Sequence, residues 1–491
     1  MNKRKTDSVA KGGSSVAIAR ILGMGFSFVL FLLLARHSNE YAAIFRTVMT
    51  YIIVAEFLGM LGLHRWLATE IAPESPKRWS IFLAINAFTL AFTAILSLTY
   101  LGIAGVGFYA QEYNQGLYLG ALAVIPSGIY ACVQSALVGI GRSHLMGKIN
   151  MTENVVRCVI SIVLVYLNEP VTDIILVFVL TRWLVAIYGF VRLKKIFSRV
   201  EPVQHWRVDP EIFRAIAKEA PKFALIIGAF LLLRNAGLLM LPALSNAEQT
   251  ALHAVCYQLF DLMLVVPSVL AMTSINAFAN KANTSNAALK KSAIQLISIT
   301  SMALFPLIAI AAGFGQQILH MFYGNKYLHA EDTLIVMMIS AGLMVIDQVL
   351  SQVMQAKKFY REDMYSIVTG GLTTLIFTPG LCLSHGAFGA GLALVIGILF
   401  TIAARFVLLK KVFTTRLLWL SVWKQSFMSL LIFFLVFGLL RLEIMHNFAE
   451  SPFLWLLIVP IVLLAYGVGI FMMGCLKKSQ IYRMRQFLFH H

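Results

Sequence analysis

The sequence has little charge. Of its 491 residues only 13% are charged, whereas 59% are hydrophobic, and soluble domains carry roughly 25% charged residues. So few charged side chains cannot cover the surface of a water-soluble fold of this length. The shortage of charge therefore excludes a soluble enzyme, a nucleic-acid binder and a disordered scaffold, and it favours an all-α polytopic membrane protein.

Cysteines and sequence motifs of catalysis are also scarce. The five cysteines are odd in number and far apart, so they form neither a disulfide framework nor a metal-type spacing. The HExxH, GxSxG and Walker patterns are absent from the sequence. We therefore predict no enzyme activity, no cofactor and no metal site. The cysteines are expected to be small hydrophobic side chains within helices; they are Cys132, Cys158, Cys256, Cys382 and Cys475.

Long apolar runs are abundant. A helix needs about 20 apolar residues to cross the hydrocarbon core of a bilayer. Fourteen stretches qualify, although Gly, Pro or a charge interrupts some of them. The predicted spans are 14–35, 42–63, 80–105, 116–140, 152–168, 171–191, 222–242, 251–275, 292–314, 333–353, 364–383, 387–409, 425–441 and 453–475.

The basic residues alternate between the two sides of these spans. Short loops rich in Lys and Arg face the cytoplasm. With the N-terminus inside, the inner segments hold 31 of the 40 Lys and Arg, and the outer loops hold three. This asymmetry predicts a cytoplasmic (inner) membrane protein with both termini inside, and it explains the net charge of +18 without a nucleic-acid partner. The first apolar run is too long for a signal peptide, so we expect it to remain as a span.

The chain contains an internal repeat. Residues 190–197 and 406–413 are identical at six of eight positions, and a polar linker separates six predicted spans from the next six. Parallel repeats of this kind are typical of alternating-access transporters, with the substrate site between the halves; a non-transporting scaffold of an envelope complex stays open. The predicted parts are a first lobe (helices 1–6) at 1–197, a cytoplasmic linker at 198–221, a second lobe (helices 7–12) at 222–413, and helices 13 and 14 with a basic tail at 414–491.

The predicted outer loops are short. The longest runs from 315 to 331, and the others have roughly ten residues or fewer. A membrane glycan polymerase or glycosyltransferase usually needs a larger outer loop that carries carboxylates or arginines. That alternative remains open, but the short loops argue against it.

Several arginines lie within predicted spans, and Arg157 lies at the inner end of one. Charge at bilayer depth is costly, so it indicates a functional group with a partner. Arginine keeps its charge and binds phosphate or carboxylate with two parallel hydrogen bonds. We therefore predict an anionic substrate, such as a pyrophosphate, bound by Arg234, Arg46, Arg20 and Arg182. The alternatives are snorkelling of Arg20 and Arg46 to the interface, and pairing of Arg182 with nearby carboxylates, Asp173 or Glu169.

Three carboxylates lie in the interior of predicted spans, away from their ends: Asp261, Glu56 and Asp347. We expect them to couple transport to an ion or to form ion pairs. Arg234 lies about 18 Å from the inner end of its helix and Asp261 about 15 Å from the outer end of the next, so the two are candidates for one pair. A purely structural ion pair, or a hydrogen-bonded carboxyl inside the bundle, is the alternative.

Several short motifs resemble one family. The segments Pro306–Leu307 and Ile318–Ala330, with the sequence ILHMFYGNKYLHA, and the opening Leu33–Arg36 (LLAR) are similar to those of polysaccharide exporters and O-antigen (Wzx-type) flippases. These belong to the multidrug/oligosaccharidyl-lipid/polysaccharide (MOP) superfamily. The similarity covers about residues 14–413, and the count of fourteen helices resembles that of lipid II flippases.

The resemblance implies a function. Family members move an undecaprenyl-pyrophosphate-linked oligosaccharide, a repeat unit of O-antigen, capsule or exopolysaccharide, and are expected to work beside a glycan polymerase or chain-length regulator. Two six-helix lobes would rock around a cavity lined by helices 1, 2, 7 and 8, while Arg182 lies on helix 6. A multidrug exporter of the same fold is the alternative, but it would favour an acidic cavity. The residues on the implied lining helices are Arg20, Arg46, Glu56, Arg234 and Asp261.

Overall fold

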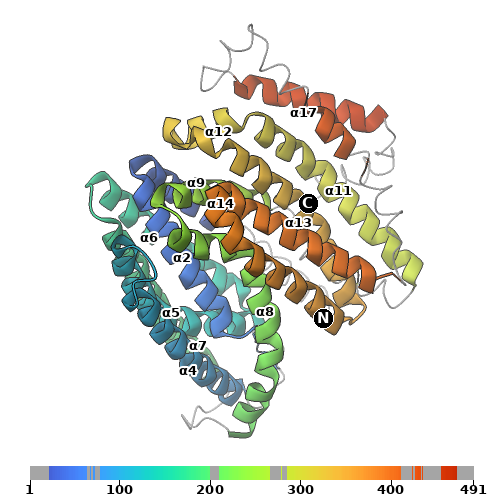
Figure 1. The fold of residues 1–491 in the computed structure, drawn as a ribbon. Helices are drawn as coiled ribbons and strands as arrows, with labels where there is room; N and C mark the ends of the chain where they lie inside the picture. Colours follow the sequence, from blue (N-terminus) through green and yellow to red (C-terminus); the bar gives the residue numbers. More distant parts are fainter. Residues whose placement is uncertain are drawn as a thin grey trace. The chain divides into compact units, whose positions relative to one another are not determined.

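In the computed structural model the described residues are helical, with turns between the helices and no strand among them (Figure 1). Nine helices in this part of the chain are long and apolar enough to cross a membrane. The prediction of an all-α polytopic membrane protein is therefore confirmed. The residues described are 22–63, 67, 70–71, 78–198, 210–265, 278, 285–410, 423, 426–432, 434 and 455–472.

The chain forms two compact units. The first consists of Met1–Val255 and Gly371–Ala393, and the second of Cys256–Gly370 and Leu394–His491. The first unit holds the helix Leu22–His37 and helices α2 (Asn39–Gly59), α4 (Arg78–Gly105), α5 (Gln111–Gly139), α6 (Ser143–Tyr166), α7 (Val171–Phe197), α8 (Pro210–Leu244) and the first half of α9 (Ala247–Met263).

Glycines let α5 lie close to its neighbours α2 and α4. A Cβ added at Gly120 would lie 2.8 Å from a methyl group of Val48, and one added at Gly128 would lie 2.6 Å from a methyl group of Thr93. In a bilayer, close packing and not exclusion of water holds helices together, and small residues permit it. These positions therefore fix how α5 packs at the centre of the first unit.

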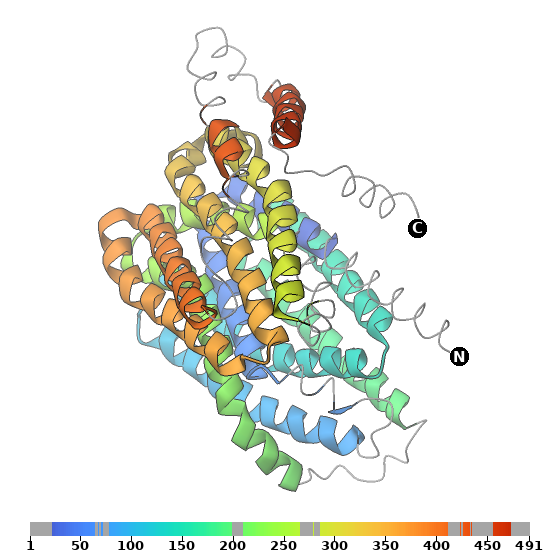
Figure 2. The ribbon, with the colours of Figure 1, turned by 90° about the vertical axis from the view of Figure 1, so that its right-hand side faces the viewer.

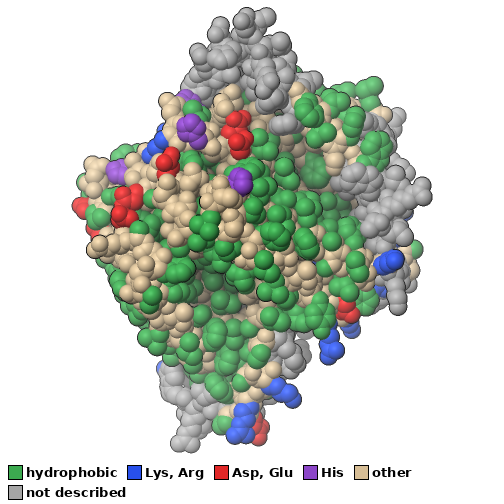
Figure 3. All heavy atoms as spheres, viewed as in Figure 1, with side chains coloured by type: hydrophobic (Ala, Val, Ile, Leu, Met, Phe, Trp, Pro, Cys, Tyr) green, Lys and Arg blue, Asp and Glu red, His purple; other side chains and the backbone are tan. Residues whose placement is uncertain are grey.

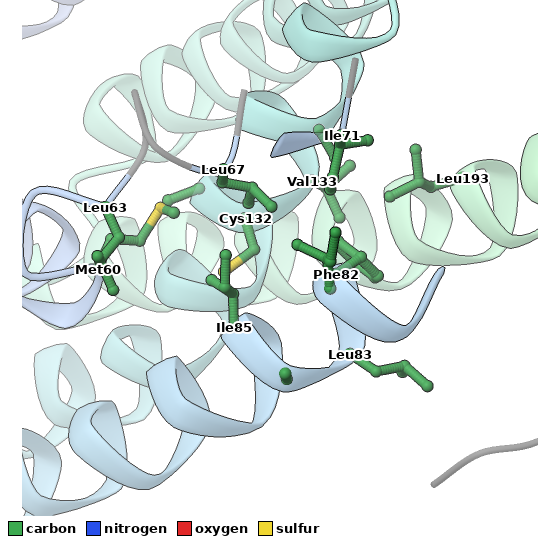
Figure 4. Packing of buried hydrophobic residues seen from close by; sticks show 14 of the residues in the cluster. Met60, Leu63, Leu67, Ile71, Phe82, Leu83, Ile85, Cys132, Val133 and Leu193 are labelled. Carbon is green, nitrogen blue, oxygen red and sulfur yellow. The ribbon is translucent and has the colours of Figure 1, made fainter. Parts of the chain in front are cut away.

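A hydrophobic cluster fills one end of the first unit (Figure 4). Side chains from α4, α5 and α7 meet the segment that follows α2. Trp79 and Phe82 of α4 stack against Phe197 of α7, with ring centroids 5.9 Å and 6.4 Å apart. The packed set holds the helices that carry the charged residues described below. The labelled members are Met60, Leu63, Leu67, Ile71, Phe82, Leu83, Ile85, Cys132, Val133 and Leu193.

The second unit contains α11 (Asn286–Gly313), α12 (Gly315–Tyr323), the 3₁₀ helix η1 (Asn325–Ala330), α13 (Glu331–Ala356), both ends of α14 (Tyr360–Leu408) and α17 (Trp455–Met472). Helices α11 and α13 lie side by side in both ribbon views (Figures 1 and 2).

Helix α14 contains two predicted spans, 364–383 and 387–409, without an intervening loop. The chain reverses at Gly386, whose φ of +54° and ψ of −127° suit glycine and strain other residues. Gln249 and His253 of α9 hold this turn. The Gln249 side chain accepts from the Ala387 amide at 2.9 Å, and His253 Nδ1 lies 3.3 Å from the Ala387 carbonyl oxygen, to which it donates.

Two helices begin earlier than their apolar runs predict. Helix α6 begins at Ser143 and not at 152, and α8 begins at Pro210 and not at 222. Hydropathy detects only the membrane-buried part, so these polar first turns lie outside the predicted spans. For α8 the sequence does predict a short amphipathic piece around 209–219, ahead of the span that begins at 222. The extra turns of α8 are amphipathic, because Ile216 is buried and Phe213 lies against Phe88 of α4 with centroids 5.8 Å apart.

The segment 315–331, predicted as an outer loop between two spans, is itself helical, because it forms α12 and η1. Gly324 joins them with a φ of +90°, which allows a sharp turn. On either side, Tyr323 and Tyr327 are buried and stack edge to face at 5.7 Å. The motif that resembles the exporter family is therefore a packed turn between helices.

Most side chains on the face drawn in Figure 3 are hydrophobic, and charged ones are few. Such a surface suits contact with lipid. Arg20, most of the linker before Pro210, most of predicted span 425–441 and the basic tail lie outside the described residues. The predicted lobe boundaries and the sidedness of the membrane stay predictions.

Reporter fusions test the predicted sidedness. We expect fusions at Gln111, Asn246 and Tyr327 to report the outer side, and fusions at Arg78 and Lys357 the cytoplasm, because basic loops remain inside. An outer signal at Lys357 would contradict the fourteen-span topology.

Candidate functional site

Four charged side chains meet inside the first unit. They come from three helices: Glu56 from α2, Glu153 and Arg157 from α6, and Arg182 from α7. We refer to them as the α2–α6–α7 charge cluster. Their exposed fractions are 23% for Glu56, 4% for Glu153, 14% for Arg157 and 11% for Arg182. With two positive and two negative groups, the cluster is formally neutral.

Arg182 is the centre of this cluster. Its Nη2 lies 3.4 Å from Glu56 Oε2, and its Nε lies 3.5 Å from Glu153 Oε1. Arg157 Nη1 approaches the same Glu153 oxygen at 3.8 Å. One guanidinium thus connects α2 to α6, although the two carboxylates are 97 positions apart in the sequence. The sequence alternative that paired Arg182 with Asp173 or Glu169 is wrong.

Aromatic and amide side chains surround the cluster. The Arg182 guanidinium carbon lies 5.1 Å from the centroid of the Phe178 ring and 5.5 Å from that of Tyr130, within the range of cation–π attraction. Arg157 donates a 2.6 Å hydrogen bond to Asn154. Tyr130 in turn donates to Asn150. These polar and aromatic contacts compensate part of the desolvation of the buried charges.

The cluster lies deep along its helices. Glu153 is ten residues from the first residue of α6, and Arg182 is eleven residues from the first residue of α7, which places them about 15 Å and 17 Å along their axes. Both positions fall near mid-helix. Arg182 is also near the middle of the predicted span 171–191, whereas Glu153 is at the beginning of the predicted span 152–168. A charge in the interior of a span is expensive and indicates a functional group by default.

A second charged group lies in the second unit. Arg405 of α14 is 1% exposed and pairs with Asp347 of α13 and with Asp363 near the start of α14. Its Nη2 lies 2.9 Å from Asp363 Oδ1, and its Nη1 donates to the Asp347 main-chain carbonyl at 2.6 Å. Ser351 donates to Asp363 at 2.9 Å. Because the contacts are short and Arg405 is buried, we interpret this group as a structural ion-pair network that holds α13 against α14. We refer to it as the Arg405 clamp.

The structure places the other predicted site residues separately. Arg46 is a partly buried residue of α2. Arg234 is a partly buried residue of α8, and its guanidinium carbon lies 5.8 Å from the centroid of the Phe230 ring. Asp261 lies near the end of α9, in the other compact unit from Arg234. The proposed Arg234–Asp261 pair therefore stays a prediction. Arg20 lies outside the described residues.

Sequence reasoning missed three members of these two groups: Glu153, Asp363 and Arg405. Glu153 and Asp363 fell at the ends of predicted spans, where a charge costs little. Arg405 is close to a predicted inner end, where basic residues are common. The one available signal was the spacing of Glu153 and Arg157, which are four residues apart and therefore face the same side of a helix.

The chemistry of the first cluster suits an oxyanion. Arg182 and Arg157 are permanent cations with planar arrays of donors that match phosphate or carboxylate oxygens. Among the residues that the structure describes, no group of three or more His, Cys, Asp or Glu could hold a metal ion. The two guanidinium groups are the side chains of this cluster whose chemistry matches an anion.

Searches by sequence give no relative: no family model and no curated protein matches the chain. Similarity appears in three dimensions, and it defines the fold as that of MOP-superfamily transporters. The inward closed conformation of the lipid II flippase MurJ matches with a TM-score of 0.76 at 13% identity, over 94% of this chain and 99% of that chain.

Two further solved structures share the fold. An inward-facing multidrug resistance MATE family transporter of the MOP superfamily matches with a TM-score of 0.59 at 12% identity, over 86% of this chain and 98% of that one. A MOP superfamily transporter from Pyrococcus furiosus, described as having a binding pocket of reverse polarity, gives a TM-score of 0.57 at 12% identity, over 87% and 96%. The similarity covers nearly the whole length of each.

Proposed function

We propose that this protein is a flippase that moves an undecaprenyl-pyrophosphate-linked oligosaccharide across the cytoplasmic membrane by alternating access. The observation that carries the proposal is the fold similarity to a lipid II flippase along 99% of that chain, with a TM-score of 0.76. The buried arginines support an anionic substrate, because a guanidinium at this depth attracts phosphate strongly.

The charge balance of the α2–α6–α7 cluster argues against a cationic drug. Multidrug transporters of the MATE family share the fold with TM-scores up to 0.59, so a multidrug exporter is the second candidate. A cation-binding site would need an excess of buried carboxylates. In the α2–α6–α7 cluster each carboxylate is matched by an arginine, which leaves no net attraction for a cation.

Export of surface glycan tests the proposal. In a host that depends on this chain for glycan export, deletion should remove surface glycan and leave lipid-linked precursor inside, and the full chain should restore export. An unchanged surface glycan together with increased sensitivity to cationic dyes would contradict the proposal and favour the multidrug exporter.

Arg234 is a second residue proposed to bind the head group. Substitution Arg234→Lys keeps the charge but removes the planar donor array. We expect membrane levels within about twofold of wild type and export reduced roughly tenfold, since removing one bidentate pair of hydrogen bonds costs about 1–2 kcal/mol. Immunoblotting and surface-glycan staining measure both. Equal export by Arg234→Lys and wild type would remove Arg234 from the proposed site.

A further inference from the structure

The two arginine-centred groups differ in the distances between the arginine and its partners. Arg405 is sealed, with contacts of 2.6 Å and 2.9 Å. The nearest contacts of Arg182, at 3.4 Å and 3.5 Å, are longer than the 2.7–2.9 Å of a charge-assisted hydrogen bond. Arg182 Nε and Glu153 Oε1 are buried and make no hydrogen bond with the described chain, and the same is true of Arg405 Nε, so the difference between the two groups lies in their contact distances. Arg182 therefore has donor capacity that its carboxylates do not use.

Glu56 is the replaceable partner of Arg182. Its side chain is 23% exposed, whereas that of Glu153 is 4% exposed. Among the described residues, Glu153 contacts two arginines, Arg182 at 3.5 Å and Arg157 at 3.8 Å, whereas Glu56 has one ion pair, to Arg182 at 3.4 Å. An incoming anion would thus reach the Glu56 side of Arg182 first and would break a single ion pair there.

The charge count sets a condition on such an exchange. The empty cluster is neutral, so a bound anion would leave a net negative charge inside the membrane, which is costly. Uptake of one proton restores neutrality. Among the two carboxylates Glu56 is the one accessible to a proton and the one whose cation the anion would occupy.

We propose that Arg182 binds an oxyanion of the substrate in the place that Glu56 occupies, and that Glu56 takes up a proton as it is displaced. In the empty site Glu56 is ionised and paired with Arg182. When a phosphate or carboxylate oxygen takes the place of Glu56 at Arg182 Nη2, Glu56 Oε2 accepts a proton from solvent, which alternating access would admit to the site, and the charge of the cluster is unchanged. Release of the anion returns the proton and restores the pair. The exchange rests on the proposed function, because it assumes an anionic head group.

The groups that face Glu56 come from three helices. They are Arg182 from α7, Glu153 and Arg157 from α6, and Tyr130 from α5. The arginines keep their charge across the physiological range, and Tyr130 donates its hydroxyl to Asn150. Glu56 is therefore the group whose titration changes the occupancy of Arg182.

Binding of small anions to the purified full-length protein tests the exchange. Inorganic pyrophosphate is one probe and glucuronate the other, since the shared oxyanion chemistry could come from the pyrophosphate or from an acidic sugar. Glu56→Gln mimics the protonated carboxyl. We expect it to bind the preferred probe about tenfold more tightly than wild type at pH 8, the effect of removing one competing ion pair. This ratio should fall toward one as the pH is lowered through the range in which wild-type Glu56 itself takes up a proton.

Matched variants separate the exchange from general effects. Glu112→Gln removes an exposed carboxylate at the start of α5 and should bind like wild type, and Arg182→Lys should weaken binding about tenfold. Glu56→Ala also removes the charge, so its anion affinity can replace that of Glu56→Gln if the Glu56→Gln protein does not fold. A Glu56→Gln or Glu56→Ala protein that binds both probes no more tightly than Glu112→Gln would overturn the exchange.

Translocation of lipid-linked oligosaccharide by the same preparations in proteoliposomes separates this inference from the proposed function. Tighter binding by Glu56→Gln without translocation by wild type would support the anion site and reject the flippase. Translocation by wild type without tighter binding by Glu56→Gln would support the flippase and reject the exchange.

Discussion

Replacing Arg405 by alanine is expected to remove most of the folded protein from the membrane. The substitution leaves Asp347 and Asp363 facing each other without a cation at positions that are 8% exposed. Stranding buried charge in this way costs about 3–5 kcal/mol, a large part of the roughly 5–15 kcal/mol by which folded proteins are typically stable. Detergent-solubilised protein should show a lower yield and a melting temperature reduced by several degrees.

Two control variants make the Arg405 result interpretable. Arg361→Ala removes an exposed arginine from the first turn of the same helix and should behave like wild type. The triple variant Arg405→Ala, Asp347→Asn, Asp363→Asn removes the stranded charges and should recover much of the yield. If Arg405→Ala has the same melting temperature as Arg361→Ala, the Arg405 clamp does not hold α13 against α14.

The substitution Arg182→Lys is expected to abolish most transport while the protein still folds. A lysine ammonium keeps the positive charge near Glu153, so the cluster stays neutral. It is a point charge without the planar donor array that reaches Glu56 and Glu153 together. We expect membrane levels within about twofold of wild type and glycan export per molecule reduced at least tenfold, because one charge-assisted hydrogen bond is worth roughly 1.5–3 kcal/mol.

Arg192→Lys is the matched control for Arg182→Lys. Arg192 is exposed near the end of the same helix, α7, so this change alters the same residue type outside the cluster. It should leave export unchanged. If Arg182→Lys lowers protein level and export in equal proportion, so that export per molecule is normal, the role of Arg182 is structural and the proposed anion site is wrong.

The apolar spans were readable from the sequence because they depend on local composition. The predicted spans 80–105 and 171–191 correspond closely to α4 and α7. The predicted start of α6 was too late. The helix begins nine residues before its apolar run, since polar turns at a membrane surface remain helical without raising hydropathy. The segment 315–331 was taken for a loop because α12 and η1 are each too short to give a clear helical period.

The sequence predicted some of the charged residues of the candidate site but not their partners. A charge within an apolar run is visible in the sequence, and so Glu56, Arg182 and Asp347 were recognised. Their partners were not, because helix packing brings together Glu56 with Arg182 and Asp347 with Arg405 across 126 and 58 positions. A single sequence records which residues are charged but not which helix faces meet. Glu153 became recognisable only once α6 and α7 were seen side by side.

Transport by the purified protein in proteoliposomes tests the central claim most directly. The vesicles carry an undecaprenyl-pyrophosphate-linked oligosaccharide whose sugar is labelled, so that the fraction exposed on each side can be measured with a membrane-impermeant sugar-modifying enzyme. The proposed function predicts that wild type transfers the labelled sugar across the bilayer, and that Arg182→Lys does so at least tenfold more slowly than Arg192→Lys. Vesicles that transport a cationic dye but leave the labelled lipid on its original side would contradict the account.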